Sequence, residues 1–205
     1  MSNVSHVALA LDPTANATEL SPTEERIVSA ALRLIGRRGV KRLGMQEISE
    51  AAGVSRGTLY RYFPSKDQVL AAAAAYDERR FAEGLAGALA PGPTAEARIR
   101  SFIAFSFDYI RTHPSRQLFE TEPEFVLGYL LAHLPKLREA ILEQLGPALD
   151  SIPAVSSGQV TRGELTDVIV RLFASSWLIA ESDERTLVQS INRILLPATT
   201  DPDAA

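Results

Sequence analysis

The chain has 205 residues, of which 46% are hydrophobic, and its 21 basic and 25 acidic side chains give a formal net charge of -4. This length allows one large domain or two small ones, and the hydrophobic content is sufficient for a core. Because the chain contains no cysteine, a disulfide framework and a thiolate zinc site are excluded. The longest apolar run is too short to span a membrane and no signal peptide is recognisable, so we expect a cytoplasmic protein.

The first predicted helix runs from Ser21 to Gly39. Residues 1–20, which precede it, lack helical periodicity and are expected to form a flexible tail. Ser21 and Glu24 have the spacing of a capping box, in which each side chain bonds the backbone N–H of the other residue. Gly39 follows the last apolar position and is expected to end the helix.

The segment 45–66 has the pattern of two short helices joined by a tight turn. Ile48 and Ala52 lie four residues apart and therefore share one face of the first helix. Gly53 suits a left-handed residue in the turn, and Ser55 is a good N-cap for the second helix. This succession is typical of a helix-turn-helix DNA-binding unit.

The outward face of the second short helix carries groups that suit DNA. Leu59 and Tyr62 are expected to face the core. Their spacing leaves four polar side chains pointing outward, those of Arg56, Thr58, Tyr60 and Arg61. Guanidinium, hydroxyl and phenol groups bond base edges and phosphate oxygens. A solvated helix face is the alternative, but the glycine turn, the caps and the apolar spacing together favour DNA binding.

Charge is distributed unevenly along the chain. Nine basic and four acidic residues lie between residues 21 and 66, a net +5, whereas the remainder carries a net -9. A basic segment attached to an acidic body is a plausible electrostatic pattern for a DNA-binding protein. The basic part is drawn to phosphates, and the acidic part opposes docking in wrong orientations.

Residues 52–70, AGVSRGTLYRYFPSKDQVL, resemble the signature of TetR-type (tetracycline-repressor-like) transcriptional regulators. The likeness is dense from Ile48 to Leu70 and looser from 26 to 44. It implies an all-α protein with an N-terminal three-helix head, which contains the helix-turn-helix, followed by a larger helical domain that dimerises and binds a ligand. We place the DNA-binding domain at 21–66, the effector-binding and dimerisation domain at 67–197 and a tail at 198–205.

The expected DNA contacts extend beyond the second short helix. Lys41 and Arg42 lie near the end of the first helix, where two compatible roles are open to them, complementing the helix dipole and binding phosphate. Lys66 lies in the first turn of the next helix, where a bound phosphate would offset its unfavourable interaction with the dipole. The full expected set is Lys41, Arg42, Met45, Gln46, Ser55, Arg56, Gly57, Thr58, Tyr60, Arg61, Tyr62 and Lys66.

The rest of the chain is also expected to be helical. A long helix begins at a second capping box, Ser65 and Gln68, and ends before Pro91. Pro135 is expected to kink or divide a later helix. The expected elements are helices at 65–90, 94–112, 116–121 and 123–145, a loop at 151–158, and helices at 163–179 and 182–196.

Aromatic side chains in this body are candidates for an apolar ligand pocket, although ordinary core packing is the alternative for each of them. The candidates are Phe102, Phe105, Tyr109, Phe125, Tyr129, His133 and Trp177. Glu120, Glu122 and Glu124 alternate near a helix break and are expected to form a solvated acidic turn rather than a metal site. We expect neither a metal nor a cofactor.

An apolar stripe on the last two helices predicts a symmetric homodimer, since one copy alone would expose it to water. Its residues are Val168, Leu172, Leu187 and Ile191.

The resemblance implies that the protein is a regulator, usually a repressor in this family, that binds an inverted-repeat operator and is released by a small apolar or amphipathic ligand. A DNA-compacting protein without an effector and a helical enzyme are alternatives. The enzyme is disfavoured because no nucleophile motif, metal-ligand spacing or phosphate loop is present.

Overall fold

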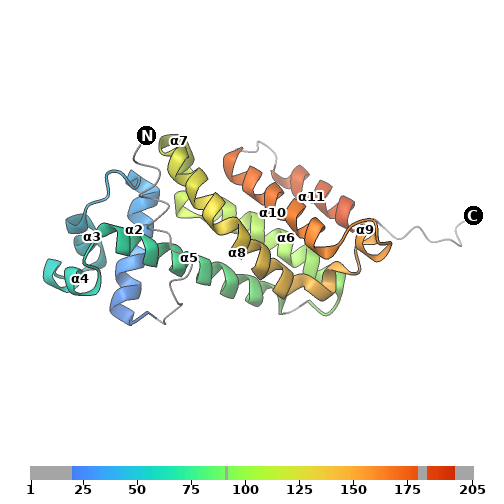
Figure 1. Ribbon diagram of the computed structural model, residues 1–205, viewed down its shortest axis with the longest axis horizontal. Coiled ribbons are helices and arrows are strands. Elements are labelled where there is room, and N and C mark those ends of the chain that lie inside the picture. Colours follow the sequence, from blue (N-terminus) through green and yellow to red (C-terminus); the bar gives the residue numbers. More distant parts are fainter. Residues whose placement is uncertain (1–19, 91, 180–183, 197–205) are drawn as a thin grey trace, which may run out of the picture. The chain divides into compact units, whose positions relative to one another are not determined.

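A computed structural model describes residues 20–90, 92–179 and 184–196, and Figure 1 shows them as helices joined by turns and loops. The tails predicted at 1–20 and 198–205 lie outside these residues, Leu20 excepted. The chain divides into two compact units, Met1–Ala82 with Arg111–Pro135 and Glu83–Ile110 with Lys136–Ala205. The domain boundaries predicted from the sequence remain predictions. No helix in the described ranges is long and apolar enough to cross a membrane.

The first unit contains the helices that the sequence places around the turn. They are α2 (Pro22–Arg38), α3 (Met45–Ala52), α4 (Arg56–Tyr62), the first part of α5 (Lys66–Leu89), the 3-10 helix η1 (Pro114–Gln117), α7 (Leu118–Thr121) and the start of α8 (Pro123–Leu149). The predicted capping box opens α2, where the Glu24 N–H donates to Ser21 Oγ at 3.3 Å and the Ser21 N–H to Glu24 Oε2 at 2.8 Å. The end of the helix before Gly39 is confirmed as well.

One continuous hydrophobic core holds the first unit together. Apolar side chains at helical spacing on α2 are buried in it, together with apolar side chains of α3, α4, α5, α7 and α8. Its members include Ile27, Ala31, Ile35, Ile48, Ala52, Leu59, Val69, Ala73, Leu118 and Val126. The helix-turn-helix therefore shares its core with the segment around α7, which lies some 70 residues later in the sequence.

The second unit contains the end of α5, most of α6 (Ala95–Thr112), the end of α8, the short α9 (Pro153–Ser156), α10 (Arg162–Leu178) and α11 (Glu184–Leu195). Aromatic rings form the centre of its core. Phe173 of α10 meets Phe102 and Phe107 of α6 edge to face, with ring centroids 5.3 and 5.4 Å apart. Such pairs add to the stability gained from burying the rings.

Of the two outcomes predicted at Pro135, a kink or a division, the division is wrong, because α8 is one helix; it also continues to Leu149 instead of ending at 145. A proline inside a helix removes one hydrogen bond to the carbonyl four residues earlier, here that of Leu131. Pro135 and Leu131 are both exposed, so this carbonyl lies on a side of the helix that water reaches. The division was predicted without this information on exposure.

Two smaller differences concern the C-terminal half. The segment predicted as a loop at 151–158 contains the one-turn helix α9. The helix predicted to start at Gly163 starts at Arg162, because Thr161 is its N-cap and forms a capping box with Glu164. The Glu164 N–H donates to Thr161 Oγ1 at 3.2 Å, and the Thr161 N–H to Glu164 Oε2 at 2.8 Å.

A glycine within α2 is explained by its neighbour in space. A β-carbon on Gly36 would overlap the carbonyl oxygen of Pro114 in η1, whereas a β-carbon on Gly87 of α5 would meet nothing within 4 Å. We predict that Gly36→Ala destabilises the protein by about 1–3 kcal/mol, as overpacking does. The control Gly87→Ala is expected to stabilise it by roughly 0.5–1 kcal/mol. Urea unfolding measures both, and a Gly36→Ala variant as stable as the parent would contradict the packing described.

Candidate nucleic-acid interface

The turn between α3 and α4 has the geometry that the sequence predicts. Gly53 adopts the left-handed conformation at φ 63° and ψ 39°. Arg26 of α2 fixes this turn from the side, since its Nη2 donates to the carbonyls of Ala52 at 2.8 Å and Gly53 at 3.0 Å. The role of Arg26 was not predicted, because its partners lie 26 and 27 residues away in sequence. A guanidinium is therefore used to hold the turn rather than to face solvent.

Helix α4 is capped at its start and anchored at its centre. At its start, the Ser55 hydroxyl accepts from the Thr58 N–H at 3.0 Å, which confirms the predicted N-cap. At its centre, Leu59 is completely buried. These two contacts fix both the position and the rotation of the helix.

The outer face of α4 is exposed as predicted. Arg56, Gly57 and Arg61 are exposed, and 44% of Tyr60 is accessible, which is unusual for a large aromatic side chain in this protein. Thr58 is half-buried, so it faces sideways rather than outward. Tyr62 is half-buried against the core, with the Arg61 guanidinium 5.2 Å from its ring centroid.

Helix α3 and the segment before it carry the remaining candidates. Lys41 and Arg42 are exposed, Met45 packs partly against the core, and Gln46 donates to Glu50 Oε1 at 3.0 Å. Gly44 is the N-cap of α3, and its N–H donates to Glu47 Oε2 at 3.2 Å.

Lys66 is bonded within the protein. The residue is half-buried, and its Nζ donates to the carbonyl oxygen of Val40 at 2.5 Å. An ammonium group has three N–H donors, so this bond does not prevent a phosphate contact but restrains where the group can reach. The phosphate contact of Lys66 remains a prediction.

The positive charges of this region therefore fall into two groups. In the first group, the side chains bond other groups of the first unit, Arg38 through an ion pair with Glu47; this group is Arg26, Arg33, Arg38 and Lys66. The second group comprises exposed cations whose side chains make no hydrogen bond or ion pair with a described residue, namely Arg37, Lys41, Arg42, Arg56 and Arg61. Only the second group has its charge freely available to bind phosphate.

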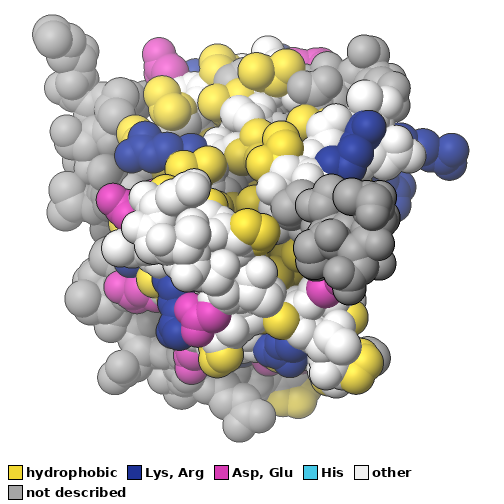
Figure 2. Space-filling model, turned by 90° about the vertical axis from the view of Figure 1, so that its right-hand side faces the viewer, with side chains coloured by type: hydrophobic (Ala, Val, Ile, Leu, Met, Phe, Trp, Pro, Cys, Tyr) yellow, Lys and Arg dark blue, Asp and Glu magenta, His cyan; other side chains and the backbone are white. Residues whose placement is uncertain are grey.

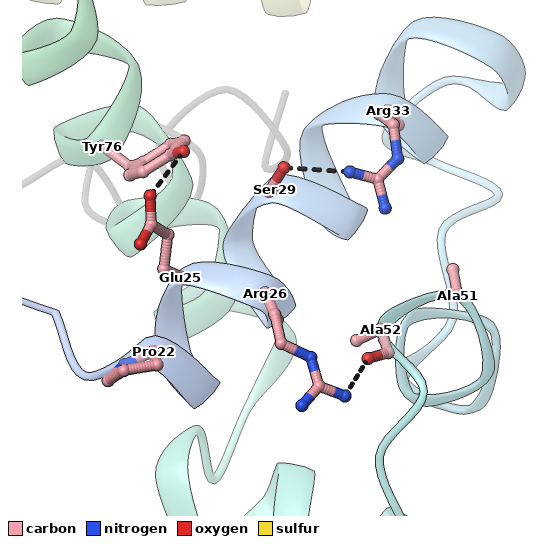
Figure 3. A pocket seen from close by; sticks show the side chains of 8 residues that line it. All are labelled: Pro22, Glu25, Arg26, Ser29, Arg33, Ala51, Ala52 and Tyr76. Atoms are coloured by element: carbon pink, nitrogen blue, oxygen red, sulfur yellow. Dashed lines mark hydrogen bonds between the residues drawn. The ribbon is translucent and has the colours of Figure 1, made fainter.

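An open pocket of about 580 Å³ lies beside the turn in the same unit, between α2, α3 and α5 (Figure 3). Its lining residues are Pro22, Glu25, Arg26, Ser29, Arg33, Ala51, Ala52 and Tyr76. The polar groups that line it bond one another, since Tyr76 Oη donates to Glu25 Oε1 at 3.1 Å and Arg33 Nη1 to Ser29 Oγ at 2.9 Å. The Arg33–Ser29 bond lies within α2, whereas the Tyr76–Glu25 bond joins α5 to α2, so the pocket has a structural role in holding these two helices together.

The predicted ligand-pocket residues are divided between the two units. Phe125, Tyr129 and His133 belong to the first, and Phe102, Phe105, Tyr109 and Trp177 to the second. Phe102 is 1% exposed and packs on Phe173, as a core residue does. The rings of Phe105 and Tyr109 lie 5.9 Å apart. Their role in ligand binding remains a prediction.

A buried polar cluster in the first unit was not predicted. His113 Nε2 lies 3.0 Å from both carboxylate oxygens of Asp77, and Tyr129 Oη donates to Asp77 Oδ2 at 3.2 Å. His133 stacks on Tyr129 and forms an ion pair with Glu78 when protonated. These contacts tie α5 to α8 and to the end of α6. No group of three or more acidic or histidine side chains among the described residues is arranged to hold a metal ion.

The predicted apolar stripe on the last helices is partly exposed. Val168 is 62% exposed, and Leu172 and Leu187 are half-buried. The prediction was wrong for Ile191, which is only 6% exposed because it faces the core of its own unit. Ile194 is 75% exposed instead and lies seven residues after Leu187, on the same side of α11. Figure 2 shows one face of the molecule on which hydrophobic side chains lie exposed among charged ones.

The phenol of Tyr76 generates a prediction about pH. Burial, and then the hydrogen bond to Glu25, raise the pKa of Tyr76 above its ordinary value of 10.0. Because the neutral phenol is favoured in the folded state, this stabilisation is complete below pH 10 and is lost as the pH rises through the higher pKa of the folded protein. We predict that Tyr76→Phe costs about 1 kcal/mol at neutral pH and removes this part of the alkaline loss of stability. Urea unfolding between pH 7 and 11 tests it, with Tyr60→Phe as the exposed control. An identical pH dependence in parent and Tyr76→Phe would contradict it.

The chain is similar to known transcriptional regulators in sequence and in fold. Residues 27–73 match the family model described as bacterial regulatory proteins, tetR family. The uncharacterized HTH-type transcriptional regulator Rv1255c of Mycobacterium tuberculosis (strain H37Rv) is 28% identical over 196 residues, covering 94% of this chain and 92% of the relative. The fatty acid degradation regulator FadR from Bacillus halodurans superposes with a TM-score of 0.62 at 20% identity, over 89% of this chain and 99% of that one. AibR, solved with isovaleryl coenzyme A and operator DNA, superposes with a TM-score of 0.59 at 18% identity, over 85% and 98%.

Proposed function

Since the chain belongs to the TetR family of bacterial transcriptional regulators, we propose that it is a sequence-specific repressor that a small apolar or amphipathic ligand releases from its operator. The exposed face of α4 is the observation that carries this proposal. Ser55 and Leu59 hold this helix in place, and its outer face presents Arg56, Tyr60 and Arg61 to solvent. The Tyr60 side chain is exposed and makes no hydrogen bond with a described residue. The proposal places the protein in the cytoplasm with its DNA and assigns it no catalytic activity.

The exposed residues divide into two proposed roles. Arg56 and Tyr60 are assigned to base edges, because α4 is the helix that enters the major groove in this arrangement. The half-buried Thr58, also an expected contact, lies between them in the sequence. Lys41 and Arg42 are assigned to the phosphate backbone, which needs positive charge rather than a defined hydrogen-bond pattern. The other expected contacts, Met45, Gln46, Ser55, Gly57, Arg61, Tyr62 and Lys66, surround these positions.

The proposed dimer uses the outer side of α10 and α11. Val168 and Ile194 are exposed, and Leu172 and Leu187 are half-buried. Apolar surface of this kind is stabilised by a second copy related by a two-fold axis. Two α4 helices then reach successive major grooves of an inverted repeat, about 34–36 Å apart.

The proposed ligand affects DNA binding because it binds one conformation of the protein more tightly than another. AibR has been solved with an acyl coenzyme A and with operator DNA, so this fold accommodates both kinds of partner in one protein. In this chain the aromatic side chains that support an apolar ligand are Phe105 and Tyr109 in the second unit and, separately, Phe125 and Tyr129 in the first. Such a ligand shifts the population of conformations by its difference in affinity between them.

The DNA-binding role is tested on α4. We predict that Arg56→Ala and Tyr60→Ala each weaken binding to a duplex selected by the parent protein from a random-sequence pool, by about 1–3 kcal/mol. Arg100→Ala is the control, since it removes an exposed cation from α6 and leaves α4 and the proposed dimer face of α10 and α11 unchanged. Fluorescence anisotropy with the labelled duplex measures the affinity. Parent affinity in an Arg56→Ala/Tyr60→Ala/Lys66→Ala variant would sink the assignment of this surface.

The dimer is tested on α10. We predict that Val168→Asp lowers the fraction of dimer, because a charge at an apolar interface loses its hydration. Ala86→Asp, on an exposed position of α5, adds the same charge elsewhere and is expected to leave the dimer intact. Light scattering at micromolar concentration gives the oligomeric state. A monomeric parent, or a fully dimeric Val168→Asp variant, would rule out this interface.

A further inference from the structure

The segment from η1 to the start of α8 packs closely against the end of α2. The β-carbon that Gly36 lacks would overlap the backbone of Pro114, and the one that Gly39 lacks would overlap the carboxylate of Glu122. Gly39 also has a φ of 83°, which L side chains rarely adopt. Two glycines within four residues therefore permit this approach, and nothing in the helix periodicity of α2 requires either of them.

Glu122 is the polar end of this contact. The sequence predicts a solvated acidic turn at residues 120–124, and the prediction is wrong for Glu122, which is 7% exposed, whereas Glu120 and Glu124 are exposed. Its Oε1 accepts from the backbone N–H of Lys41 at 3.0 Å. Its Oε2 has no hydrogen-bond partner in the described part of the chain. A buried carboxylate with one bonded oxygen is costly to keep, and the bond to the Lys41 N–H offsets part of this cost.

The peptide that Glu122 bonds is held from both sides. Its N–H, which belongs to Lys41, donates to Glu122, and its carbonyl, which belongs to Val40, accepts from Lys66 Nζ at 2.5 Å. A cation thus bonds the oxygen of the peptide and an anion bonds its hydrogen, so each bond polarises the group in the direction that strengthens the other. We call this arrangement the Val40–Lys41 clamp.

The clamp lies directly before the exposed cations proposed to bind phosphate. Lys41 and Arg42 follow this peptide, and their side chains have no hydrogen bond or ion pair with described residues. Their direction is therefore set by the backbone that carries them. A backbone contact that fixes this peptide reduces the conformational freedom that DNA binding would otherwise have to remove.

We propose that Glu122 is a positioning residue for DNA binding, whose carboxylate holds the Val40–Lys41 peptide so that Lys41 and Arg42 meet the phosphate backbone. This rests on the proposed function, since it presumes that these two cations bind DNA. Glu122 does not touch DNA in this proposal. It acts through the geometry of the peptide, and a second residue, Lys66, holds the other side of the same group.

Two substitutions of Glu122 test separately the length and the charge of its side chain. Glu122→Gln keeps a side-chain oxygen at the right distance but removes the charge, whereas Glu122→Asp keeps the charge but is one methylene too short to reach the Lys41 N–H. Glu124→Gln is the matched control, an exposed glutamate two residues away. The probe is the duplex selected by the parent protein from a random-sequence pool, and its affinity is measured between 50 and 200 mM salt.

We expect Glu122→Asp to weaken binding about tenfold and to reduce the slope of log affinity against log salt by up to roughly 1.8, the share of two phosphate contacts. Glu122→Gln and Glu124→Gln are expected to stay within about threefold of the parent. In the free protein, hydrogen exchange of the Lys41 amide is expected to be faster in Glu122→Asp and near the parent rate in Glu122→Gln. The effect of Lys41→Ala/Arg42→Ala is expected to be much smaller in Glu122→Asp than in the parent.

The outcomes separate this inference from the proposed function. A parent protein that selects no duplex overturns the function. A parent that binds DNA, with a folded Glu122→Asp variant of the same affinity and salt slope, overturns the role of Glu122 alone. The role of Glu122 is also overturned if the losses of DNA affinity caused by Glu122→Asp and by Lys41→Ala/Arg42→Ala are fully additive. It is overturned as well if Glu122→Asp leaves the hydrogen exchange of the Lys41 amide unchanged. If Glu122→Asp does not fold, a Glu122→Gln variant with parent-like Lys41 exchange but a tenfold loss of affinity overturns it.

Discussion

The orientation of α4 depends on the burial of its one fully enclosed side chain, Leu59. A helix of seven residues is far below the length at which isolated helices are stable in water. Burying a leucine contributes about 1.5–3 kcal/mol, and the core that receives it is built from α2, α3, α5 and the α7 segment. The face that α4 offers to solvent is thus a consequence of tertiary packing, and a defect in that shared core would displace it without any change on its surface.

The same dependence explains what could be predicted from the sequence. Caps, glycine turns and apolar spacing are local, so the boundaries of α2, α3 and α4 followed from residues such as Ser21, Gly53 and Ser55. Contacts distant in sequence did not. Glu122 was read as solvated because its partner, the Lys41 N–H, lies 81 residues earlier. Asp77 and His113 are 36 residues apart, and no spacing rule connects them.

Charge shows the same division between local and distant information. The net +5 between residues 21 and 66 predicts an affinity for DNA, but it does not show which cations remain available. Four of the nine side chains bond groups of their own unit, those of Arg26, Arg33, Arg38 and Lys66. The other five make no hydrogen bond or ion pair with described residues, those of Arg37, Lys41, Arg42, Arg56 and Arg61. Counting charges therefore overstates the number of phosphate contacts, and a salt dependence calculated from all nine cations would be too steep.

The Val40–Lys41 clamp also connects the DNA-binding surface to the helices expected to sense a ligand. Lys66 opens α5 and Glu122 immediately precedes α8, so the clamp joins the starts of these two helices through one peptide. Further along, Tyr129 and His133 of α8 bond Asp77 and Glu78 of α5. Eleven residues separate Glu122 from His133, roughly 16 Å at the rise of a helix. A ligand that replaced either of these bonds would change the distance between α5 and α8. The clamp joins the starts of the same two helices, so this change would act on the clamp. The buried polar cluster and Glu122 are then two parts of one linkage, and a ligand affects DNA binding to the extent that it favours one spacing over the other.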